Sequence, residues 1–418
     1  MRKFSNNIGK YNDDILLEMN DKGLFDEYSD EHFLIKALNG QMDYFDKYKN
    51  LIKGSLYYST ENINAVNFIA NFSSKFGGFY KHFKEKEMEN FVKNQLSAGK
   101  SNYKEEQFFR AMSEINVINF LLSFGPTKLE KAIYEPKLGK NGSKPEARLI
   151  YENGIVIDVE VKTPGFNTKI DGDEKGVLIP TLLLDGNCKL KFKKKCDKYG
   201  FKFILPRVSK LKDYINSAGK KFQIPANKNH INILFINWTY TDIERRGYLE
   251  PYSLLYNNLN GILKNKDAAL NIGISKDALE KISAIIVYQD SFNSLIFGDF
   301  RYVWEGYNFR MLPNMLMNKQ HIDIDIIRDS IRMNPPKLRD NMMPYEFKVS
   351  RKCFRYSFED VFKVTEYMNR IVKSKIKNND NFTYFDKRYY KKTLKENRKK
   401  LKNIMKLKQL GYIHDKFY

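Results

Sequence analysis

The stretch that decides the fold is KPEARLIYENGIVIDVEVKTP, residues Lys144 to Pro164. In its second half, apolar and charged residues alternate. Successive side chains of a β-strand point to opposite faces, so this half predicts a strand with two unlike faces. One face carries four aliphatic side chains: Ile155, Ile157, Val159 and Val161. The other face carries Val156 and then three charged side chains: Asp158, Glu160 and Lys162.

The turn before this strand sets which residues face each other across the hairpin. Asn153-Gly154 is a strong hairpin signal. A two-residue loop would put Glu146 on the aliphatic face, whereas a three-residue loop with Gly154 in the left-handed conformation pairs Glu146 with Glu160. We expect the three-residue loop or an equivalent bulge. It gathers five charged residues on one face: Glu146, Arg148, Asp158, Glu160 and Lys162.

Two carboxylates as cross-strand neighbours repel each other, by about 4 kcal/mol at ~4 Å near a protein surface. A divalent cation between Glu146 and Glu160 would turn this repulsion into attraction, and oxygen-only ligands favour Mg²⁺ or Mn²⁺. The alternative is an ordinary half-exposed strand with charges facing water. The second acid and the layers expected on both sides of the sheet argue against that alternative.

Around this hairpin the sequence predicts three regions: a helical region over residues 1–100, a mixed α/β domain over 101–330, and a basic helical region over 331–418. The α/β domain is expected to contain a helix at 103–125, three strands (132–138, 146–152 and 155–162), a basic irregular excursion at 166–206, a helix at 209–222, and buried strands at 230–238 and 281–290. This order of elements indicates a mixed sheet with helices on its faces.

The net charge of +22 is the first indication of a partner. From Tyr345 to Tyr418 the chain has 21 Lys and Arg against 8 Asp and Glu, so 13 of these charges lie there. Such an excess favours nucleic acid over a membrane surface or a merely solvated helix face. No apolar run has the ~20 residues of a membrane span, and the N-terminus lacks a signal-peptide core. With only three cysteines, we expect a soluble protein in the cytoplasm.

The sequence contains no motif typical of a zinc site, an NTPase or a serine hydrolase. The cysteines and histidines do not have zinc-ligand spacing. Neither a phosphate-binding loop of the NTPase type nor a G-x-S-x-G nucleophile elbow occurs.

The motif formed by Pro145-Glu146, thirteen residues, and Glu160-Val161-Lys162 resembles that of the PD-(D/E)XK nuclease superfamily. The departure is Glu146, where that family usually has Asp. The resemblance covers roughly residues 101–290 and implies a restriction-endonuclease-like αβββαβ core with a mixed sheet, flanked here by helical N- and C-terminal regions. It also implies catalytic roles for three residues: Glu146, Glu160 and Lys162. Metal ligands would be Glu114, Glu146, Glu160 and the backbone carbonyl of Val161. Asp158 could replace Glu146 as a ligand, but we expect it to accept a hydrogen bond from Arg148 instead.

The function implied is a metal-dependent endonuclease of restriction or antiphage-defence type, cutting DNA in preference to RNA. Two alternatives stay open: a nucleic-acid-binding protein with an inactive nuclease fold, and a ribonuclease of the same fold. A homodimer is considered because double-strand cutters of this fold are often dimers. Six basic residues are expected to contact nucleic acid: Lys220, Lys221, Lys392, Arg398, Lys399 and Lys400.

Overall fold

The structure is a computed structural model, and it describes residues 14–41, 65–163, 176–178, 186–200, 202–204, 207–238, 249–256, 261–288, 309–331 and 348–349, with single residues and pairs between 363 and 406. The chain divides into two compact units. The first comprises Met1–Asn167, Asp213–Thr241 and Ile274–Pro336, and the second comprises Thr168–Lys212, Asp242–Gly273 and Lys337–Tyr418. The helices before residue 100 thus share a unit with the sheet. The predicted division into the regions 1–100, 101–330 and 331–418 stays a prediction.

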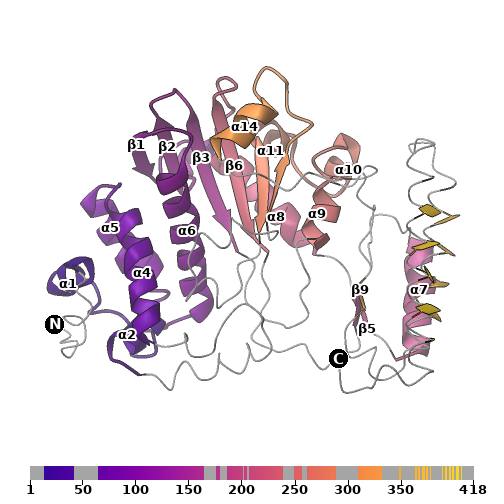
Figure 1. The fold of residues 1–418 in the computed structure, drawn as a ribbon, viewed down its shortest axis with the longest axis horizontal. Coiled ribbons are helices and arrows are strands. Elements are labelled where there is room, and N and C mark those ends of the chain that lie inside the picture. Colours follow the sequence, from indigo (N-terminus) through magenta and orange to yellow (C-terminus); the bar gives the residue numbers. More distant parts are fainter. Residues whose placement is uncertain are drawn as a thin grey trace. The chain divides into compact units, whose positions relative to one another are not determined.

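The first unit is built on a six-stranded mixed sheet in the order β1-β2-β3-β6-β7-β8 (Figure 1). Its strands are β1 (Leu129–Tyr134), β2 (Ala147–Tyr151), β3 (Val156–Lys162), β6 (His230–Asn237), β7 (Ala284–Tyr288) and β8 (Phe309–Pro313). The two outer pairings β1–β2 and β7–β8 and the hairpin β2–β3 are antiparallel, whereas β3–β6 and β6–β7 are parallel. The protein is therefore of the α/β class.

Helices precede, interrupt and follow the strands of this unit. They are α1 (Asp14–Asp21), α2 (Phe33–Leu38), α4 (Ala65–Tyr80), α5 (Glu85–Phe91), the π-helix η4 (Val92–Leu96), α6 (Glu105–Phe124), the short 3₁₀ turn η5 (Lys140–Gly142), α8 (Val208–Lys221), α11 (Lys276–Lys281) and α14 (Ile324–Ser330). The first residues of α8, up to Lys212, are grouped with the second unit.

The second unit contains α7 (Gly186–Lys198), α9 (Leu249–Tyr256), α10 (Lys266–Asn271) and a small sheet in the order β5-β4-β9. The strands of that sheet are β4 (Gly176–Leu178), β5 (Lys202–Ile204) and β9 (Lys348–Val349). The prediction of an irregular excursion over 166–206 is therefore wrong for the part that forms α7, β4 and β5. The described residues between 363 and 406 are helical, in agreement with the basic helices predicted there.

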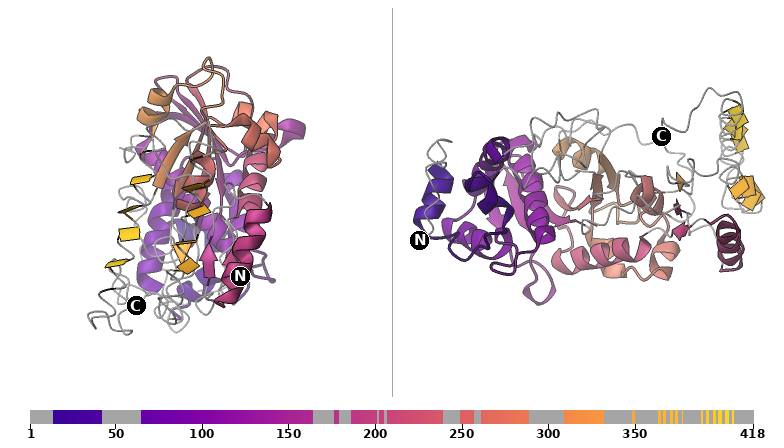
Figure 2. Two further views of the ribbon diagram at one scale, coloured as in Figure 1. Left: turned by 90° about the vertical axis from the view of Figure 1, so that its right-hand side faces the viewer. Right: turned by 90° about the horizontal axis from the view of Figure 1, so that it is seen from below.

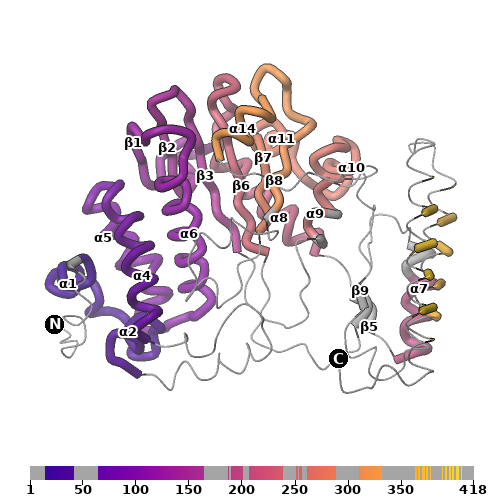
Figure 3. Tube along the Cα trace, in the orientation of Figure 1, coloured from indigo at the N-terminus to yellow at the C-terminus, as the bar shows by residue number. Residues whose placement is uncertain are grey.

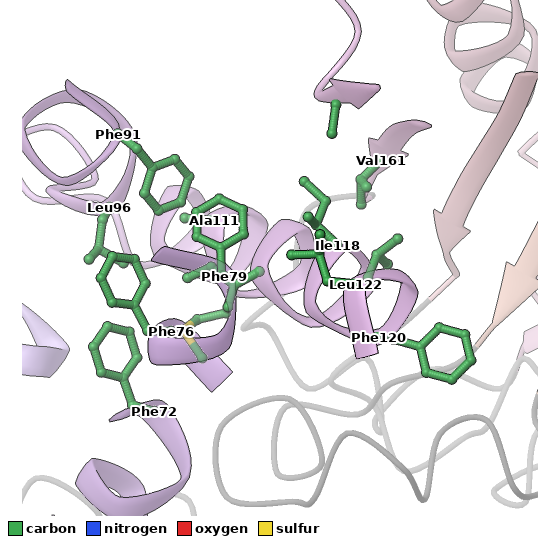
Figure 4. Close-up of a cluster of buried hydrophobic side chains, with 14 of the residues drawn as sticks. Phe72, Phe76, Phe79, Phe91, Leu96, Ala111, Ile118, Phe120, Leu122 and Val161 are labelled. Carbon is green, nitrogen blue, oxygen red and sulfur yellow. The ribbon is translucent and has the colours of Figure 1, made fainter. Parts of the chain in front are cut away.

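The core of the first unit lies between α6, the aliphatic face of the sheet and the N-terminal helices. Leu149, Ile157 and Val159 are fully buried in the same cluster as the side chains of α6. On its far side α6 packs against α4, as the ribbon views and the chain trace show (Figures 1, 2 and 3). Phe72, Phe76 and Phe79 of α4 contribute rings to this cluster (Figure 4). Since α6 is covered from both sides, it is buried nearly all round.

The opposite face of the sheet is the one that carries the charged row. Parallel pairing of β3 with β6 sets Asp158 beside Asn232, Glu160 beside Leu234 and Lys162 beside Ile236. This face has its own buried side chains, among them Leu234 of β6. Layers on both sides of the sheet explain why Asp158 and Glu160 have no exposed surface, although both are acids.

Candidate functional site

The β2–β3 hairpin has the predicted register. Arg148 pairs with Asp158 and Ala147 with Val159, which leaves three residues in the loop. Gly154 has φ of +76°, in the left-handed region, and its N–H donates to the Tyr151 carbonyl at 2.9 Å. The Glu146 N–H donates to the Val159 carbonyl at 2.9 Å, so Glu146 continues the pairing toward Glu160. The prediction of a three-residue loop is confirmed.

Four charged side chains meet at the open end of this hairpin and form what we term the carboxylate cluster: Glu146, Glu160, Lys162 and Lys221. The Lys221 Nζ lies 3.3 Å from Glu146 Oε1 and 2.7 Å from Glu160 Oε1. The Lys162 Nζ lies 2.5 Å from Glu160 Oε1. Glu160 has no exposed surface, and the other three side chains are 14 to 24% exposed. Two acids and two lysines balance in charge, which makes their burial tolerable.

Glu160 is in contact with both lysines of the cluster. Lys221 donates to Glu160 Oε2 at 2.9 Å, and the Lys162 and Lys221 Nζ atoms lie 2.5 and 2.7 Å from Glu160 Oε1. The carboxylates of Glu146 and Glu160 already converge on one positive group, the Lys221 ammonium. These residues fit a hard divalent ion that takes its remaining ligands from water or phosphate.

Burial changes the protonation of the cluster. Burial, and after it the negative charge of Glu160, raises the pKa of Glu146 from its ordinary value of 4.5 to about 7. Burial alone would lower the pKa of Lys221, but the charges of Glu146 and Glu160 outweigh it and raise that pKa above its ordinary value. Lys221 therefore stays charged, whereas Glu146 titrates near neutral pH.

The position of Lys221 is fixed by the loop between β1 and β2. The Ser143 hydroxyl donates to the Lys220 carbonyl at 2.7 Å. Gly139 packs so closely on the end of α8 that a Cβ there would lie 2.2 Å from the Lys220 oxygen and 2.6 Å from the Lys221 Cα. Only glycine fits this approach without a shift of backbone.

Glu114, a predicted metal ligand, lies close to the cluster but is not part of it. It belongs to α6 and is buried, and its Oε1 lies 2.8 Å from the Tyr134 hydroxyl. Burial, and next the charge of Glu146, raises the pKa of Glu114 well above its ordinary value. Among the described residues, no group of three or more His, Cys, Asp or Glu side chains is arranged to bind a metal. The carboxylate cluster therefore contains two possible metal-binding carboxylates, those of Glu146 and Glu160, and Glu114 is not one of them.

Asp158 has a separate role on the same face. The Arg148 guanidinium donates to both of its oxygens, with Nε and Nη2 each at 2.7 Å. The His230 Nε2 lies 2.9 Å from Asp158 Oδ2, while the Ala226 N–H donates to His230 Nδ1 at 3.3 Å. Since Nδ1 accepts, Nε2 carries the proton and donates to Asp158. Both carboxylate oxygens of Asp158 thus accept hydrogen bonds, which agrees with its predicted role as the acceptor of Arg148 and leaves neither oxygen for a metal.

The remaining predicted site residues are spread over both units. The Val161 side chain is on the aliphatic face, so only its backbone carbonyl is left for a metal. Lys220 is exposed and precedes the partly buried Lys221 at the end of α8. Lys392, Arg398 and Lys399 are exposed on helical residues of the second unit, and Arg398 Nε also lies 3.0 Å from Glu366 Oε1. Lys400 lies outside the described residues.

Lys221 contacts the two carboxylates of the cluster, and the predicted contact of Lys221 with nucleic acid stays a prediction. The sequence signals only that Lys221 lies on the apolar face of an amphipathic helix, because it follows Ala218 by three residues. His230 and Tyr134 were not identified as partners of acids, since their contacts join elements distant in sequence.

Comparisons with known proteins identify no relative. No protein-family model, no curated protein and no solved structure matches the chain. No helix in the described part of the chain is long and apolar enough to cross a lipid bilayer.

Proposed function

We propose that the protein is a metal-dependent endonuclease that hydrolyses phosphodiester bonds in DNA. The observation that carries this proposal is the meeting of Glu146 and Glu160 at one ammonium group, with a second lysine, Lys162, beside Glu160. The motif of these residues resembles that of the PD-(D/E)XK nucleases, and a restriction-endonuclease-like core belongs to the same proposal. The net charge of +22 supports a polyanionic substrate.

Each residue of the cluster has a role in this proposal. Glu146 and Glu160 would hold Mg²⁺ or Mn²⁺ with their carboxylates, together with the Val161 carbonyl. The bound ion supplies a Lewis acid that polarises the phosphodiester. Lys162 orients the attacking water or stabilises negative charge on the phosphate. Lys221 neutralises the two acids and adds positive charge where the substrate's phosphate would approach.

The test is cleavage of double-stranded DNA with and without Mg²⁺. Lys162→Ala and Glu160→Gln are expected to reduce cleavage by about 100-fold or more, the usual effect of removing a group that stabilises transition-state charge. Binding of DNA by Lys162→Ala is expected to persist. The matched control is Lys131→Ala, which removes an exposed lysine from β1 of the same sheet. Full cleavage by both Lys162→Ala and Glu160→Gln would refute the site assignment.

The same assay with RNA decides between the two nucleic acids. A ribonuclease of this fold would degrade RNA with the same dependence on Lys162. If the unmodified protein cleaves RNA but not DNA, and Lys162→Ala no longer cleaves RNA, the substrate is RNA and the site assignment stands.

A second candidate function is nucleic-acid binding by an inactive nuclease-like fold. Two observations favour it: the Lys221 ammonium already lies between the carboxylates, and Glu146 stands where the similar family usually has Asp. It predicts tight DNA binding without cleavage in any divalent metal. Cleavage that depends on both Mg²⁺ and Lys162 would exclude it.

A further inference from the structure

A row of lysines runs along one face of helix α7, in the second unit. Side chains three and four positions apart lie on the same face of an α-helix. Lys191, Lys194 and Lys198 have this spacing, and all three are exposed. Together they form what we term the lysine stripe of α7. At about 1.5 Å of rise per residue, the stripe extends about 10 Å along the helix axis.

Another side of α7 is apolar and packs inside the same unit. Phe192 and Cys196 are fully buried. The Phe192 ring stacks on the Tyr367 ring, with centroids 6.2 Å apart and ring planes 15° from parallel. These contacts fix which side of α7 is turned inward, so the lysine stripe is left facing water.

Aromatic rings join α7 to a second basic segment. Lys195 Nζ lies 5.4 Å from the centroid of the Tyr199 ring and 5.7 Å from that of the Tyr367 ring. Lys363 Nζ lies 6.0 Å from the centroid of the Tyr199 ring. A cation within about 6 Å of an aromatic face is attracted to it. The described helical residues beyond 363 include further exposed basic ones: Arg370, Lys373 and Lys377. Two basic segments thus meet at Tyr199 and Tyr367.

The lysine stripe weakens the helix that carries it. Like charges three or four positions apart repel each other and destabilise an α-helix. Lys198 lies in the last turn, where a positive charge interacts favourably with the helix dipole. Lys191 and Lys194 precede that turn, and the dipole effect falls off within it. The stability of α7 therefore does not account for the stripe.

Nearby acids do not balance the stripe either. The only acid in the sequence of α7 is Asp197. Within the described ranges, the three lysines of the stripe form no ion pair. In the first unit, by contrast, Lys128 pairs with Glu152 at 3.0 Å, and Lys144 pairs with Glu135 at 3.1 Å. The stripe is thus a run of positive charge available to an external anion.

The geometry of α7 suits a nucleic-acid backbone better than a membrane. Phosphates follow one another about every 3.4 Å along each strand of duplex DNA, so a stripe about 10 Å long can contact several of them. A helix that binds a membrane surface buries its own apolar face in the lipid. In α7 the apolar side chains of Phe192 and Cys196 are covered by protein, and one exposed leucine, Leu190, adds little apolar area.

We infer that the lysine stripe of α7 is a further contact surface for nucleic acid and binds the phosphate backbone of duplex DNA. None of its lysines is among the six basic residues predicted from the sequence to contact nucleic acid. The choice of DNA rests on the proposed function, whereas binding at the stripe does not require hydrolysis. Contacts to phosphates carry no information on base sequence, so the stripe holds DNA of any sequence.

The experiment measures the affinity of the full chain for a mixed-sequence DNA duplex, without divalent ions, at several salt concentrations. The stripe variant, Lys191→Gln/Lys194→Gln/Lys198→Gln, is expected to lower the slope of log K against log salt concentration by about 2 to 3, since each lysine on a phosphate contributes about 0.9. All three residues are exposed, and glutamine is as good a helix former as lysine, so the fold is expected to persist.

The matched control is Lys81→Gln/Lys86→Gln/Lys93→Gln, which removes the same charge from exposed positions of the first unit. The control is expected to keep the slope of the unmodified protein. An equal loss of slope in the stripe variant and the control would overturn the inference, because net charge alone would then explain binding. An unchanged slope in the stripe variant would overturn it as well.

A second arm separates DNA from a membrane surface. Vesicles of phosphatidylcholine and phosphatidylserine replace the duplex, and the unmodified protein and the stripe variant are expected to bind them to the same extent. Loss of vesicle binding in the stripe variant, with its DNA binding unchanged, would overturn the inference in favour of a membrane. If DNA is never cleaved but the stripe variant lowers the slope, the inference stands and the hydrolytic proposal fails. If DNA is cleaved but the stripe variant keeps the slope, the inference fails and the hydrolytic proposal stands.

Discussion

At the scale of single residues, Glu146 makes the stability of the protein depend on pH. Its pKa of about 7 in the folded chain, against an ordinary 4.5, means that folding favours the protonated acid. Between pH 4.5 and 7 the unfolded chain loses this proton before the folded chain does. The resulting contribution is full below pH 4.5 and is lost as the pH rises toward 7.

Glu146→Gln removes this dependence. Without divalent ions, the free energy of unfolding of the unmodified protein should fall relative to the variant by up to about 3 kcal/mol between pH 4.5 and 7. Denaturant unfolding at several pH values measures the difference. A constant difference across that range would show that Glu146 ionises normally in the folded chain.

Removal of Arg148 is expected to destabilise the hairpin strongly. Asp158 is fully buried, and removing the guanidinium would leave its charge with only His230 as a partner. Arg148→Ala should cost about 3 kcal/mol, as is typical when one half of a buried ion pair is removed. Arg110→Ala is the control, because Arg110 forms an exposed pair with Glu106 on α6 worth about 0.5 kcal/mol or less. Similar losses from both variants, measured by chemical denaturation, would contradict this account.

At the scale of elements, the loop between β1 and β2 holds the end of α8 in place. Gly139 has φ of −84°, which alanine adopts readily, so Gly139→Ala tests the close packing of this position on the Lys220 and Lys221 backbone and on the Ser143 hydroxyl. We expect the variant to move Lys221 and to lower DNA cleavage about tenfold or more, as misplacement of a site group does.

The control for this prediction lies three residues further along the same loop. Gly142 has φ of +73° but open space around it, so Gly142→Ala adds backbone strain without a collision. It should cost about 1 kcal/mol of stability and leave cleavage unchanged. Equal cleavage by the two variants would mean that the loop does not position Lys221.

The elements that could be predicted are those whose pattern is local. The alternation in β3 and the turn at Gly154 specify the hairpin and its register, and both are observed. Strand β8 was missed because Phe309–Pro313 shows no regular alternation and ends in proline. Helix α7 was missed because its many lysines hide the positions of Phe192 and Cys196, its buried residues.

The candidate site could be predicted only where the hairpin itself builds it. The proximity of Glu146 and Glu160 follows from strand pairing, and so does the contact of Arg148 with Asp158. The contact of Lys221 with the acids requires the packing of α8 on the sheet, which no short stretch of sequence encodes. The same holds for Glu114, whose burial depends on α6 being covered from both sides.

At the scale of the whole molecule, the charge distribution predicts how binding responds to salt. Each phosphate contacted by Lys or Arg contributes about 0.9 to the slope of log K against log salt concentration. Deleting residues 345–418, which hold 13 of the 22 net positive charges, should flatten this slope for DNA. Lys392→Gln/Lys399→Gln keeps the chain intact and should lower the slope by up to about 2. An unchanged slope in both proteins, measured by fluorescence anisotropy, would exclude the basic region from phosphate binding.

The pairing of Lys162 and Lys221 with two acids has a consequence for how the protein folds. Since the chain supplies its own counter-ions, its acids need no inorganic ion to stay together while the hairpin forms. We therefore expect the hairpin to fold without magnesium or manganese, and in the proposed nuclease the ion would bind to a site that is already formed.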